Sequence, residues 1–454
     1  MIADIVKNLR SGFASGRTLN IEWRLLQLSQ LRRLLHDNQQ RFVTTLQEDL
    51  GKCAFETATT EIQVVISEIA YALRHLKKWI KPQPVSSPLI TQFARNWIIA
   101  EPKGVVLIMG AWNYPVQLLG SPLVGAIAAG NAVLLKPSEL ASHTAQLWDE
   151  LIPKYLDINC HAVMVGGVAE TTELLKHKFD HILYTGGGRV ARIVMTATAQ
   201  HLTPVTLELG GKSPCIVAAD ADIDITARRI AWGKFLNAGQ TCIAPDYVLV
   251  ERQAAPQLMA AIKRWLIEFY GENPATSPDY ARIINAAHMD RLISLLAQQT
   301  IVHGGRFDRQ SRYLEPTLIS DPSSSSPLMQ DEIFGPLLPV LSVDNIDAAI
   351  TFVRERPKPL ALYVFSGSHA VQQNIVARLS AGNVCINDTL MFMAAPKLPF
   401  GGIGDSGMGC YHGKHGFDTF SHNKSVMRRS WWPDPGWRYP PFSVSKLRIL
   451  KRLW

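Results

Sequence analysis

Apolar side chains in the first 80 residues recur at the spacing of a helix. Leu25, Leu28, Leu31 and Leu35 follow one another at intervals of three or four positions, which places them on one helical face. The segment Lys81–Pro88 interrupts this pattern with three prolines and two serines. We therefore expect helices up to about residue 80 and a connection after them.

From residue 97 to residue 210, short apolar runs alternate with longer stretches of helical character. The runs predict strands at Val105–Met109, Val133–Leu135, Val163–Val165, Ile182–Tyr184 and Val205–Leu207. The stretches between them predict helices at Gln117–Ala129, Ser142–Leu151, Ala169–Lys176 and Val190–Ala199. This alternation predicts an α/β fold with a Rossmann-like parallel sheet, in which ligands bind beyond the carboxyl ends of the strands.

A second alternating region runs from about Ser213 to Asn387. It contains an expected helix at Ile225–Leu236, an expected strand at Tyr247–Val250 and a serine-rich surface loop at Pro322–Pro327. The chain has 454 residues, a length that suits two or three domains. We therefore predict a second α/β domain after the first.

The net charge of +8 is concentrated at the C-terminus. From Lys424 onward eight basic residues stand against one acidic residue, Asp434, so this tail alone carries +7. The rest of the chain is close to neutral, which argues against a nucleic-acid-binding surface. Within the tail, Ser443–Trp454 is predicted to be a short amphipathic helix with apolar and basic side chains on opposite faces.

Composition and cysteine spacing narrow the class of protein further. With 47% hydrophobic and 19% charged residues, the sequence is typical of a globular protein. Its six cysteines form no CxxC pair and no cluster with histidines, so we expect no metal site and a reducing, cytoplasmic environment. The sequence has no signal-peptide pattern and no run of about 20 apolar residues, so we expect no membrane-spanning helix.

Three polar groups suit covalent catalysis. Cys242 closes the glycine-bearing turn Asn237–Cys242, where free backbone N–H groups favour a nucleophilic thiolate. Glu208 stands at the end of an apolar strand and can act as a general base. Asn113 follows the strand Val105–Met109, so its amide can donate to a developing oxyanion. Taken singly, they also fit a buried thiol, a surface acid and a turn asparagine.

Further groups near strand ends suit a nucleotide. Lys136 and Glu139 follow the second strand and can meet a ribose and its neighbouring phosphate. The turn Gly186–Gly188 opens a helix, where glycines let the backbone approach a phosphate. Glu332 and Phe334 can hold a ribose and pack against a heterocycle. The glycine turn does not spell the usual GxGxxG pattern, and each of these motifs also fits an ordinary turn or charge pair.

In this order and spacing, the motifs together resemble the aldehyde dehydrogenase superfamily. The matching runs are WNYP, KPSE, the glycine turn, LELGGKSP, GQTC, EIFGP and LPFGGIG, and the similarity extends from about Leu19 to Pro441. HLTPVTLELGGKSP, AWGKF and RYPP are similar to its class 3 branch, which includes fatty and aromatic aldehyde dehydrogenases. The resemblance implies NAD- or NADP-dependent oxidation of aldehydes, with medium- or long-chain apolar aldehydes favoured, to carboxylic acids through a cysteine thioester.

The resemblance also implies a role for each matching residue. Cys242 corresponds to the nucleophile, Glu208 to the base that activates the deacylating water, and Asn113 to the oxyanion donor. The implied cofactor-binding residues are Lys136, Glu139, Gly186, Gly187, Val190, Leu209, Glu332 and Phe334.

The sequence departs from the family pattern in the glycine turn. Gly187 stands where a serine is usual, and Ala191 where a glycine is usual. A hydroxyl donor to the pyrophosphate is therefore missing, and the phosphate contacts must depend more on the backbone. Lys234, eight residues before Cys242, could help to hold the thiolate electrostatically, but a solvated lysine on a helix face is the favoured expectation.

The resemblance further implies the organisation of the chain. Residues 1–80 and 100–209 would form the NAD(P)-binding domain, 210–388 the catalytic domain, 81–99 and 389–422 an oligomerisation or bridging element, and 423–454 the basic tail. A homodimer is implied, and the tail is expected to lie on a membrane surface, to gate apolar substrates or to pack on the partner subunit.

Two other functions compete with this one. The first is a dehydrogenase that passes its thioester to coenzyme A; Glu208 argues against it, because hydrolysis is the step that needs this base. The second is a non-catalytic protein with the same fold, a reading that predicts loss of the nucleophile, whereas Cys242, Glu208 and Asn113 are all present.

Overall fold

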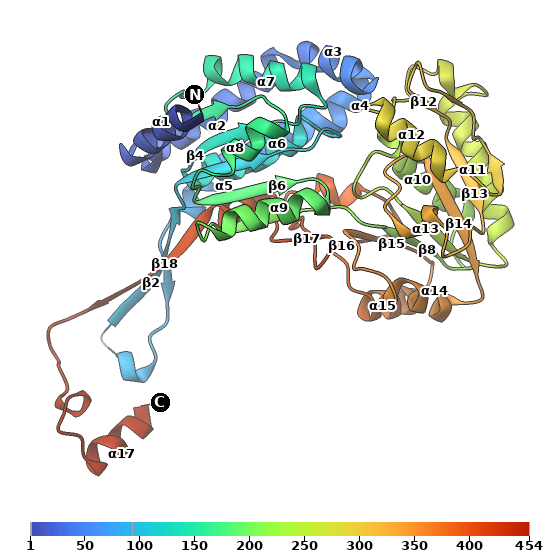
Figure 1. Ribbon diagram of the computed structural model, residues 1–454. Helices are drawn as coiled ribbons and strands as arrows, with labels where there is room; N and C mark the ends of the chain where they lie inside the picture. Colours follow the sequence, from blue (N-terminus) through green and yellow to red (C-terminus); the bar gives the residue numbers. More distant parts are fainter. Residues whose placement is uncertain (1, 93, 454) are drawn as a thin grey trace.

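Two large β-sheets, each covered by helices, form the two lobes of the computed structural model, which describes residues 2–92 and 94–453 (Figure 1). The N-terminal lobe lies at the left of Figure 1 and the second lobe at the right. A third, antiparallel sheet of three strands projects from the N-terminal lobe as an arm that ends in the C-terminal helix. The predicted α/β class with parallel Rossmann-like sheets is confirmed.

The sheet of the first lobe has six strands in the order β17-β7-β6-β3-β4-β5, all parallel except β17. The strands are β3 (Val105–Met109), β4 (Ala132–Lys136), β5 (His161–Val163), β6 (His181–Thr185), β7 (Val205–Glu208) and β17 (Gly407–Met408). The strand predicted at Val163–Val165 is wrong by two residues, because β5 begins at His161. The His161 ring is buried and stacks on Trp23, so a polar residue type occupies a core position there.

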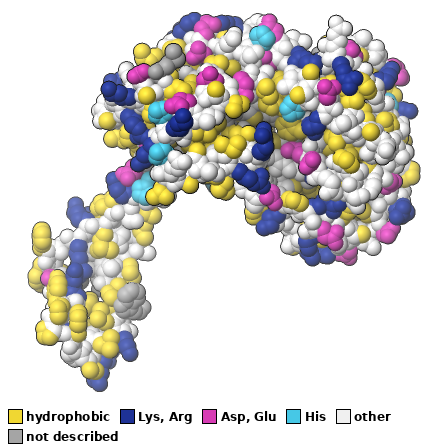
Figure 2. All heavy atoms as spheres, in the orientation of Figure 1, with side chains coloured by type: hydrophobic (Ala, Val, Ile, Leu, Met, Phe, Trp, Pro, Cys, Tyr) yellow, Lys and Arg dark blue, Asp and Glu magenta, His cyan; other side chains and the backbone are white. Residues whose placement is uncertain are grey.

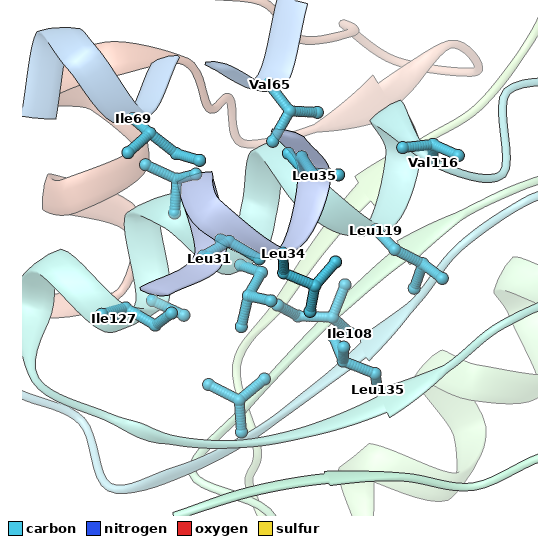
Figure 3. Close-up of a cluster of buried hydrophobic side chains, with 14 of the residues drawn as sticks. Leu31, Leu34, Leu35, Val65, Ile69, Ile108, Val116, Leu119, Ile127 and Leu135 are labelled. Carbon is cyan, nitrogen blue, oxygen red and sulfur yellow. The ribbon is translucent and has the colours of Figure 1, made fainter. Parts of the chain in front are cut away.

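Alternating side chains of the central strands feed two separate cores, one on each face of the sheet. Val106 and Ile108 of β3 point to one core, and Val105 and Leu107 to the other. Figure 3 shows the first core, in which Leu31 of α2 gathers with Ile108 of β3 and other apolar side chains. Both faces of the sheet are therefore buried, as a parallel sheet requires.

Helices cover both faces of this sheet. The helices of the first core are α2 (Ile21–Asp37), α3 (Gln39–Leu50), α5 (Gln63–Trp79), α6 (Gln117–Ala129) and α7 (Ser142–Tyr155). Those of the second core are α1 (Ile2–Ala14), α8 (Val168–Leu174) and α9 (Gly188–Ala199). The short helix α4 (Ala54–Glu56) and a π-helical turn, Thr57–Ile62, precede α5.

The sheet of the second lobe has seven strands in the order β10-β13-β14-β9-β8-β15-β16, all parallel except β10. The strands are β8 (Pro214–Val217), β9 (Tyr247–Glu251), β10 (Ile301–His303), β13 (Thr317–Ser320), β14 (Leu337–Val343), β15 (Ala361–Phe365) and β16 (Asn383–Ile386). The helices are α10 (Ile223–Phe235), α11 (Ala255–Tyr270), α12 (Ala286–Leu295), α13 (Pro327–Gln330), α14 (Ile346–Arg354) and α15 (His369–Arg378). A two-stranded ladder of β11 (Phe307–Asp308) and β12 (Tyr313–Leu314) completes this lobe.

The arm pairs β1 (Gln83–Val85), β2 (Ala94–Pro102) and β18 (Ser421–Arg429). The segment Lys81–Pro88 contains the edge strand β1, which the sequence pattern did not predict; an edge strand tolerates its Pro84. The boundary expected after residue 422 falls inside β18. Before that strand, α16 (Gly413–Thr419) packs on α6 of the first lobe.

The predicted C-terminal helix is present as α17 (Val444–Leu453), and its last predicted residue lies outside the described residues. It contacts the turn η3 (Leu89–Thr91) of the arm. Among residues 2–92 and 94–453, no helix is both long enough and apolar enough to cross a membrane.

Candidate active site

A cavity of about 270 Å³ lies where the carboxyl ends of the first sheet meet the second lobe. Cys242 and Glu208 both line it. Most of its remaining wall is apolar and comes from α6, from α10 and the Cys242 loop that follows it, and from the segment after residue 389: Leu118, Trp232, Leu236, Ile243, Leu390, Met391, Met393 and Phe400. The structure thus brings the expected nucleophile and base into one largely apolar cavity.

The loop that carries Cys242 is held in an unusual backbone conformation. Asn237 and Ala238 adopt left-handed φ values of 52° and 51°, which non-glycine residues rarely do. The buried Gln240 side chain anchors the loop, because its Nε2 donates to the Arg282 carbonyl at 2.9 Å and its Oε1 accepts from the Ile284 N–H at 3.0 Å. The surrounding structure therefore fixes the position of the thiol.

The Asn113 amide contacts this loop directly. Its Nδ2 donates to the carbonyl of Gln240, two residues before Cys242, at 3.0 Å. A carboxamide nitrogen carries two hydrogens, so one N–H remains for a further acceptor. The next residues also join the two lobes, because the Tyr114 and Thr241 hydroxyls are hydrogen-bonded at 2.7 Å.

Glu208 ends β7, where it pairs with Thr185 on β6 and with Gly407 on β17. Its carboxyl oxygens are buried and have no hydrogen-bond partner among the described residues. Burial raises the pKa of this carboxyl well above its usual value. Burial thus favours the protonated form of this carboxyl, and water that enters the cavity would restore the carboxylate that a general base requires.

The Cys242 thiol lies in the same low-dielectric environment. Burial, together with the negative charges of Glu332 and Glu208, raises its pKa to about 12. Burial therefore favours the protonated thiol at neutral pH. Its nucleophilic form needs a change in the surrounding charge or solvation.

A second, more polar cleft of about 620 Å³ lies between the lobes, and Leu209 lines both this cleft and the cavity of Cys242. Gly187 and Gly188 line it at the start of α9, and a Cβ at Gly187 would meet nothing within 4 Å. Exposed backbone N–H groups at a helix N-terminus favour a phosphate. The cleft is thus open where a dinucleotide pyrophosphate would approach the backbone.

Glu332 lies on the opposite wall of this cleft. Its carboxylate packs so closely on Gly210 that a Cβ there would lie 2.0 Å from Oε2. Burial and the negative charge of Asp246 raise the Glu332 pKa to about 8, although the Gly211 N–H counteracts this by hydrogen bonding. The acceptor oxygens of this side chain suit the hydroxyl groups of a ribose.

Phe334 follows in a left-handed conformation, φ 46°, and its ring meets Trp112 edge to face with centroids 5.3 Å apart. Arg291 on α12 holds this segment by donating to the Ile333 carbonyl at 2.7 Å and, over longer distances, to its two neighbours. Glu332 and Phe334 therefore sit on a loop that is braced from behind.

The other expected cofactor residues lie along the same edge of the first sheet. Lys136 and Tyr184 both pair with Met109, so β4, β3 and β6 end side by side. Lys136 is buried and lies 3.4 Å from the half-exposed Glu139, and burial lowers its pKa. Val190 follows Gly187 in the first turn of α9, where its N–H donates to the Gly187 carbonyl. These residues and the glycine turn can hold the adenosine half of NAD(P).

The expectation for Lys234 is wrong. Its side chain is fully buried, and its Nζ has no hydrogen-bond partner in the described part of the chain. Burial lowers its pKa to about 8, and the nearby Asp246 and Glu332 counteract that effect while Lys212 adds to it. The sequence around Lys234 gave no signal of burial, because that burial depends on how α10 packs against α11, a helix later in the chain.

Sequence reasoning also missed the residues that support the site. Lys212 bonds Asp246 at 2.5 Å and the carbonyls of Leu328 and Asp331 at 2.9 Å. Lys52 and Glu61 form a fully buried ion pair. Lys212 is the lysine of the LELGGKSP motif. Lys52 and Glu61 belong to no recognised motif, so the sequence did not indicate that they are buried or paired. Within the described ranges, no group of three or more His, Cys, Asp or Glu residues could hold a metal ion.

Comparison with known proteins agrees with this geometry. Residues 1–426 match the aldehyde dehydrogenase family. The chain is 49% identical over 444 residues to aldehyde dehydrogenase family 3 member A2 of Pongo abelii, covering 97% of this chain and 92% of the relative. It is 48% identical to the "dimeric NADP-preferring" aldehyde dehydrogenase of Rattus norvegicus, with 97% and 98% covered.

Solved structures give the same result. The substrate-bound state of Staphylococcus aureus AldH has a TM-score of 0.97 and 44% identity, with 100% of this chain and 99% of that chain covered. The expected similarity to class 3 is confirmed by the names of the family 3 relatives. The chain belongs to the aldehyde dehydrogenase family and is an NAD(P)-dependent oxidoreductase that converts aldehydes to carboxylic acids.

Proposed function

We propose that Cys242 is the nucleophile of this enzyme, Glu208 its general base and Asn113 its oxyanion donor. One observation carries the proposal: Cys242 and Glu208 line the same apolar cavity, and the Asn113 amide bonds the loop of Cys242. The cofactor would lie in the adjoining cleft, held by Lys136, Glu139 and the turn Gly186–Gly187 at one end and by Glu332 and Phe334 at the other.

In acylation the Cys242 thiol gives its proton to solvent, the sulfur bonds to the carbonyl carbon of the aldehyde, and the carbonyl oxygen becomes an alkoxide. The free N–H of the Asn113 amide and the Cys242 backbone N–H donate to that oxygen; one such donor is typically worth ~3–4 kcal/mol in the transition state. Bound NAD(P)⁺ supplies the acceptor for the hydride of the aldehyde carbon. Cys242 then holds the acyl group as a thioester.

In deacylation Glu208 takes a proton from water, and the water oxygen attacks the acyl carbon. The bond between sulfur and carbon breaks, the carboxylic acid leaves, and the sulfur takes the proton from Glu208, which regenerates the thiol and the carboxylate. Burial disfavours the charged form of Glu208, so water that enters the cavity must first restore the carboxylate; that carboxylate is then a stronger base than an exposed one.

Glu208→Gln tests this assignment. Gln keeps the shape of the side chain but cannot take the proton, so we expect a rapid burst of reduced cofactor followed by a slow steady phase. Rapid mixing of wild type and variant under the same conditions measures both phases. A uniformly slow reaction without a burst would assign Glu208 to the hydride step instead, and acyl-CoA formed on adding coenzyme A would favour the acylating alternative.

The apolar wall of the Cys242 cavity supports medium- or long-chain aldehydes as substrates. Each buried CH₂ contributes ~0.8 kcal/mol, so kcat/KM should rise about fourfold per methylene until the cavity is filled. A series of unbranched aldehydes, run with NAD and with NADP, measures this dependence. A flat series would remove the support.

The exposed strands of the arm support a homodimer, the assembly that the name of the rat relative also states. β18 lies at one edge of its sheet, and most of its side chains are exposed. Beyond it, Trp431 and Trp432 are 99% and 81% exposed. Large apolar side chains on an extended arm favour burial against a second subunit.

The composition of the tail supports a second role: a cytoplasmic enzyme that binds reversibly to the surface of an anionic membrane. Exposed Val444, Leu447 and Ile449 share α17 with Lys451 and Arg452, and Figure 2 shows apolar and basic side chains together at the end of the arm. Each basic residue near an anionic leaflet contributes ~1 kcal/mol.

Deletion after Pro441 separates the two uses of the tail. Loss of binding to anionic vesicles, with activity toward long-chain aldehydes reduced and short-chain activity kept, supports the membrane role. Unchanged vesicle behaviour with a dissociated dimer assigns the tail to assembly alone.

A further inference from the structure

We propose that the buried ion pair between Lys52 and Glu61 positions the Asn113 amide for aldehyde oxidation. Lys52 and Glu61 would be positioning residues, which act through Asn113 and touch neither substrate nor cofactor. The inference rests on the proposed role of Asn113 as the oxyanion donor.

The ion pair lies inside the first lobe, next to the cavity of Cys242. Lys52 stands between α3 and α4, and Glu61 belongs to the π-helical turn Thr57–Ile62. Both side chains are 0% exposed, and the Lys52 Nζ lies 2.5 Å from the Glu61 Oε1. Thr59 and Thr60 of the same turn line the substrate cavity, and single π-helical turns occur frequently at functional sites.

Lys52 bonds the residue that carries the expected oxyanion donor. Its Nζ donates to the Asn113 carbonyl at 3.0 Å and lies 3.9 Å from the centre of the Tyr114 ring. An ammonium group has three N–H donors, so Glu61, Asn113 and the ring face account for them all. Lys52 therefore holds the main chain of Asn113 through its carbonyl.

Glu61 fixes the following residues. Its Oε2 accepts from the backbone N–H groups of Val116, at 2.9 Å, and Gln117, at 3.1 Å, at the start of α6. Together the two side chains hold the main chain on both sides of Pro115. A hydrophobic pair could fill the same space, but it could supply neither the donor to Asn113 nor the acceptor for two N–H groups.

The same carbonyl joins the nucleophile loop. The Asn237 Nδ2 donates to the Asn113 carbonyl at 2.8 Å and to the Gln240 carbonyl at 3.1 Å. The Gln240 carbonyl is also the acceptor for the Asn113 amide. Lys52 and Asn237 thus bind one atom of Asn113 from two lobes, and any shift of that atom turns the amide relative to Cys242.

A buried ion pair stabilises a fold weakly compared with an apolar pair of similar volume. The reaction rate, in contrast, is sensitive to geometry, because a displacement of about 1 Å in a catalytic group can slow a reaction about 100-fold. We therefore expect the pair to affect the rate of hydride transfer more than the stability of the fold.

The test is a double-mutant cycle with Lys52→Met and Asn113→Ala. The measured quantity is the burst-phase rate of reduced cofactor, with 1-deuterated aldehyde used to verify that hydride transfer limits the burst. Lys52→Met should slow this rate by about 10- to 100-fold in the wild type. In the Asn113→Ala background it should change the rate by less than about twofold, because the group it positions is already absent.

Two further variants separate positioning from folding. Lys52→Met combined with Glu61→Gln removes both charges yet keeps an acceptor for α6, so the melting temperature should recover while the burst stays slow. Asp49→Asn is the matched control, because Asp49 is also buried and lies three residues before Lys52. Its carboxylate accepts from the Thr144 N–H of α7 at 2.9 Å. It should lower the melting temperature and leave the burst rate unchanged.

The outcomes distinguish the inference from the proposed function. If Asn113→Ala alone leaves the burst rate unchanged, the oxyanion assignment fails. If Asn113→Ala slows the burst but Lys52→Met has no effect, or has the same effect in both backgrounds, only the positioning role is overturned. Recovery of the burst rate together with stability in the doubly neutral variant would also overturn it.

Discussion

The two cavities that meet at Leu209 differ in polarity and in the groups that line them. The cavity of Cys242 is largely apolar, and the buried Glu208 carboxyl that lines it has no hydrogen-bond partner among the described residues. The neighbouring cleft is more polar and is lined by glycine backbone and by charged side chains that include Glu332. Under the proposed assignment, the reaction takes place where charge is costly, and the cofactor binds where the backbone is open. Changes in the first cavity should therefore affect rates, and changes in the second should affect cofactor affinity.

Cys242→Ala is expected to give the largest difference between an effect on the reaction rate and an effect on cofactor binding. Removal of the nucleophile should lower aldehyde oxidation by about 10⁴-fold or more, as for other covalent catalysts. Cofactor binding should stay within about twofold, since Cys242 lines the cavity and does not line the cleft. Steady-state rates and fluorescence titration with reduced cofactor measure the two effects. Retention of more than a few per cent of the wild-type rate would sink the assignment.

Glu332→Gln tests whether the charge of Glu332 in the cleft affects Cys242 in the neighbouring cavity. At every pH used in the assay the Cys242 thiol lies below its pKa, so the thiolate fraction rises about tenfold per pH unit. Because the Glu332 charge raises that pKa, its removal should lower it and speed alkylation at pH 9 by up to about tenfold.

The measurement is the rate of iodoacetamide labelling between pH 7 and 10, with Cys242→Ala as the background for the other cysteines. The wild-type rate should climb throughout this range, because the pKa of about 12 is not reached. A plateau below pH 9, or slower labelling in Glu332→Gln, would contradict the assigned cause.

The smallest effect is expected from Gly187→Ser, which sharpens the description of the cleft. A side chain at this position meets no atom within 4 Å, and the backbone φ of −82° suits any residue. The restored hydroxyl should donate to the cofactor phosphate and lower its KM by about threefold, the effect of one modest hydrogen bond. Gly187→Ala should leave KM unchanged, and an equal gain for both variants would assign the effect to the helix rather than the hydroxyl.

The sequence allowed the strands of the first sheet to be predicted because their apolar runs are short and bounded. Glu208 and Asn113 stand directly after such runs, so their convergence follows from the common edge of a parallel sheet. His161 and Lys234 show the limit of the method. Both are polar residue types in core positions, and their burial depends on packing against segments distant in sequence.

The pairing of Lys52 and Glu61 was also not predictable from the local sequence. Nine positions separate them, in a region predicted only as helical, and their common partner Asn113 lies 61 residues beyond Lys52. No local pattern relates a lysine in a turn to a carbonyl so far along the chain. Long-range polar contacts of this kind become visible only once the fold brings the segments together.

The bonds between the lobes beside Cys242 determine how the molecule can open. The Arg282 N–H donates to the Leu50 carbonyl at 2.7 Å, and Arg312 donates to the Asp49 carbonyl at 3.0 Å. Arg282 also accepts the hydrogen bond of the Gln240 anchor, whereas Gly187 and Glu332 line the cleft proposed for the cofactor. A hinge at these bonds would let that cleft widen for exchange of the cofactor while the wall around Cys242 stays in place.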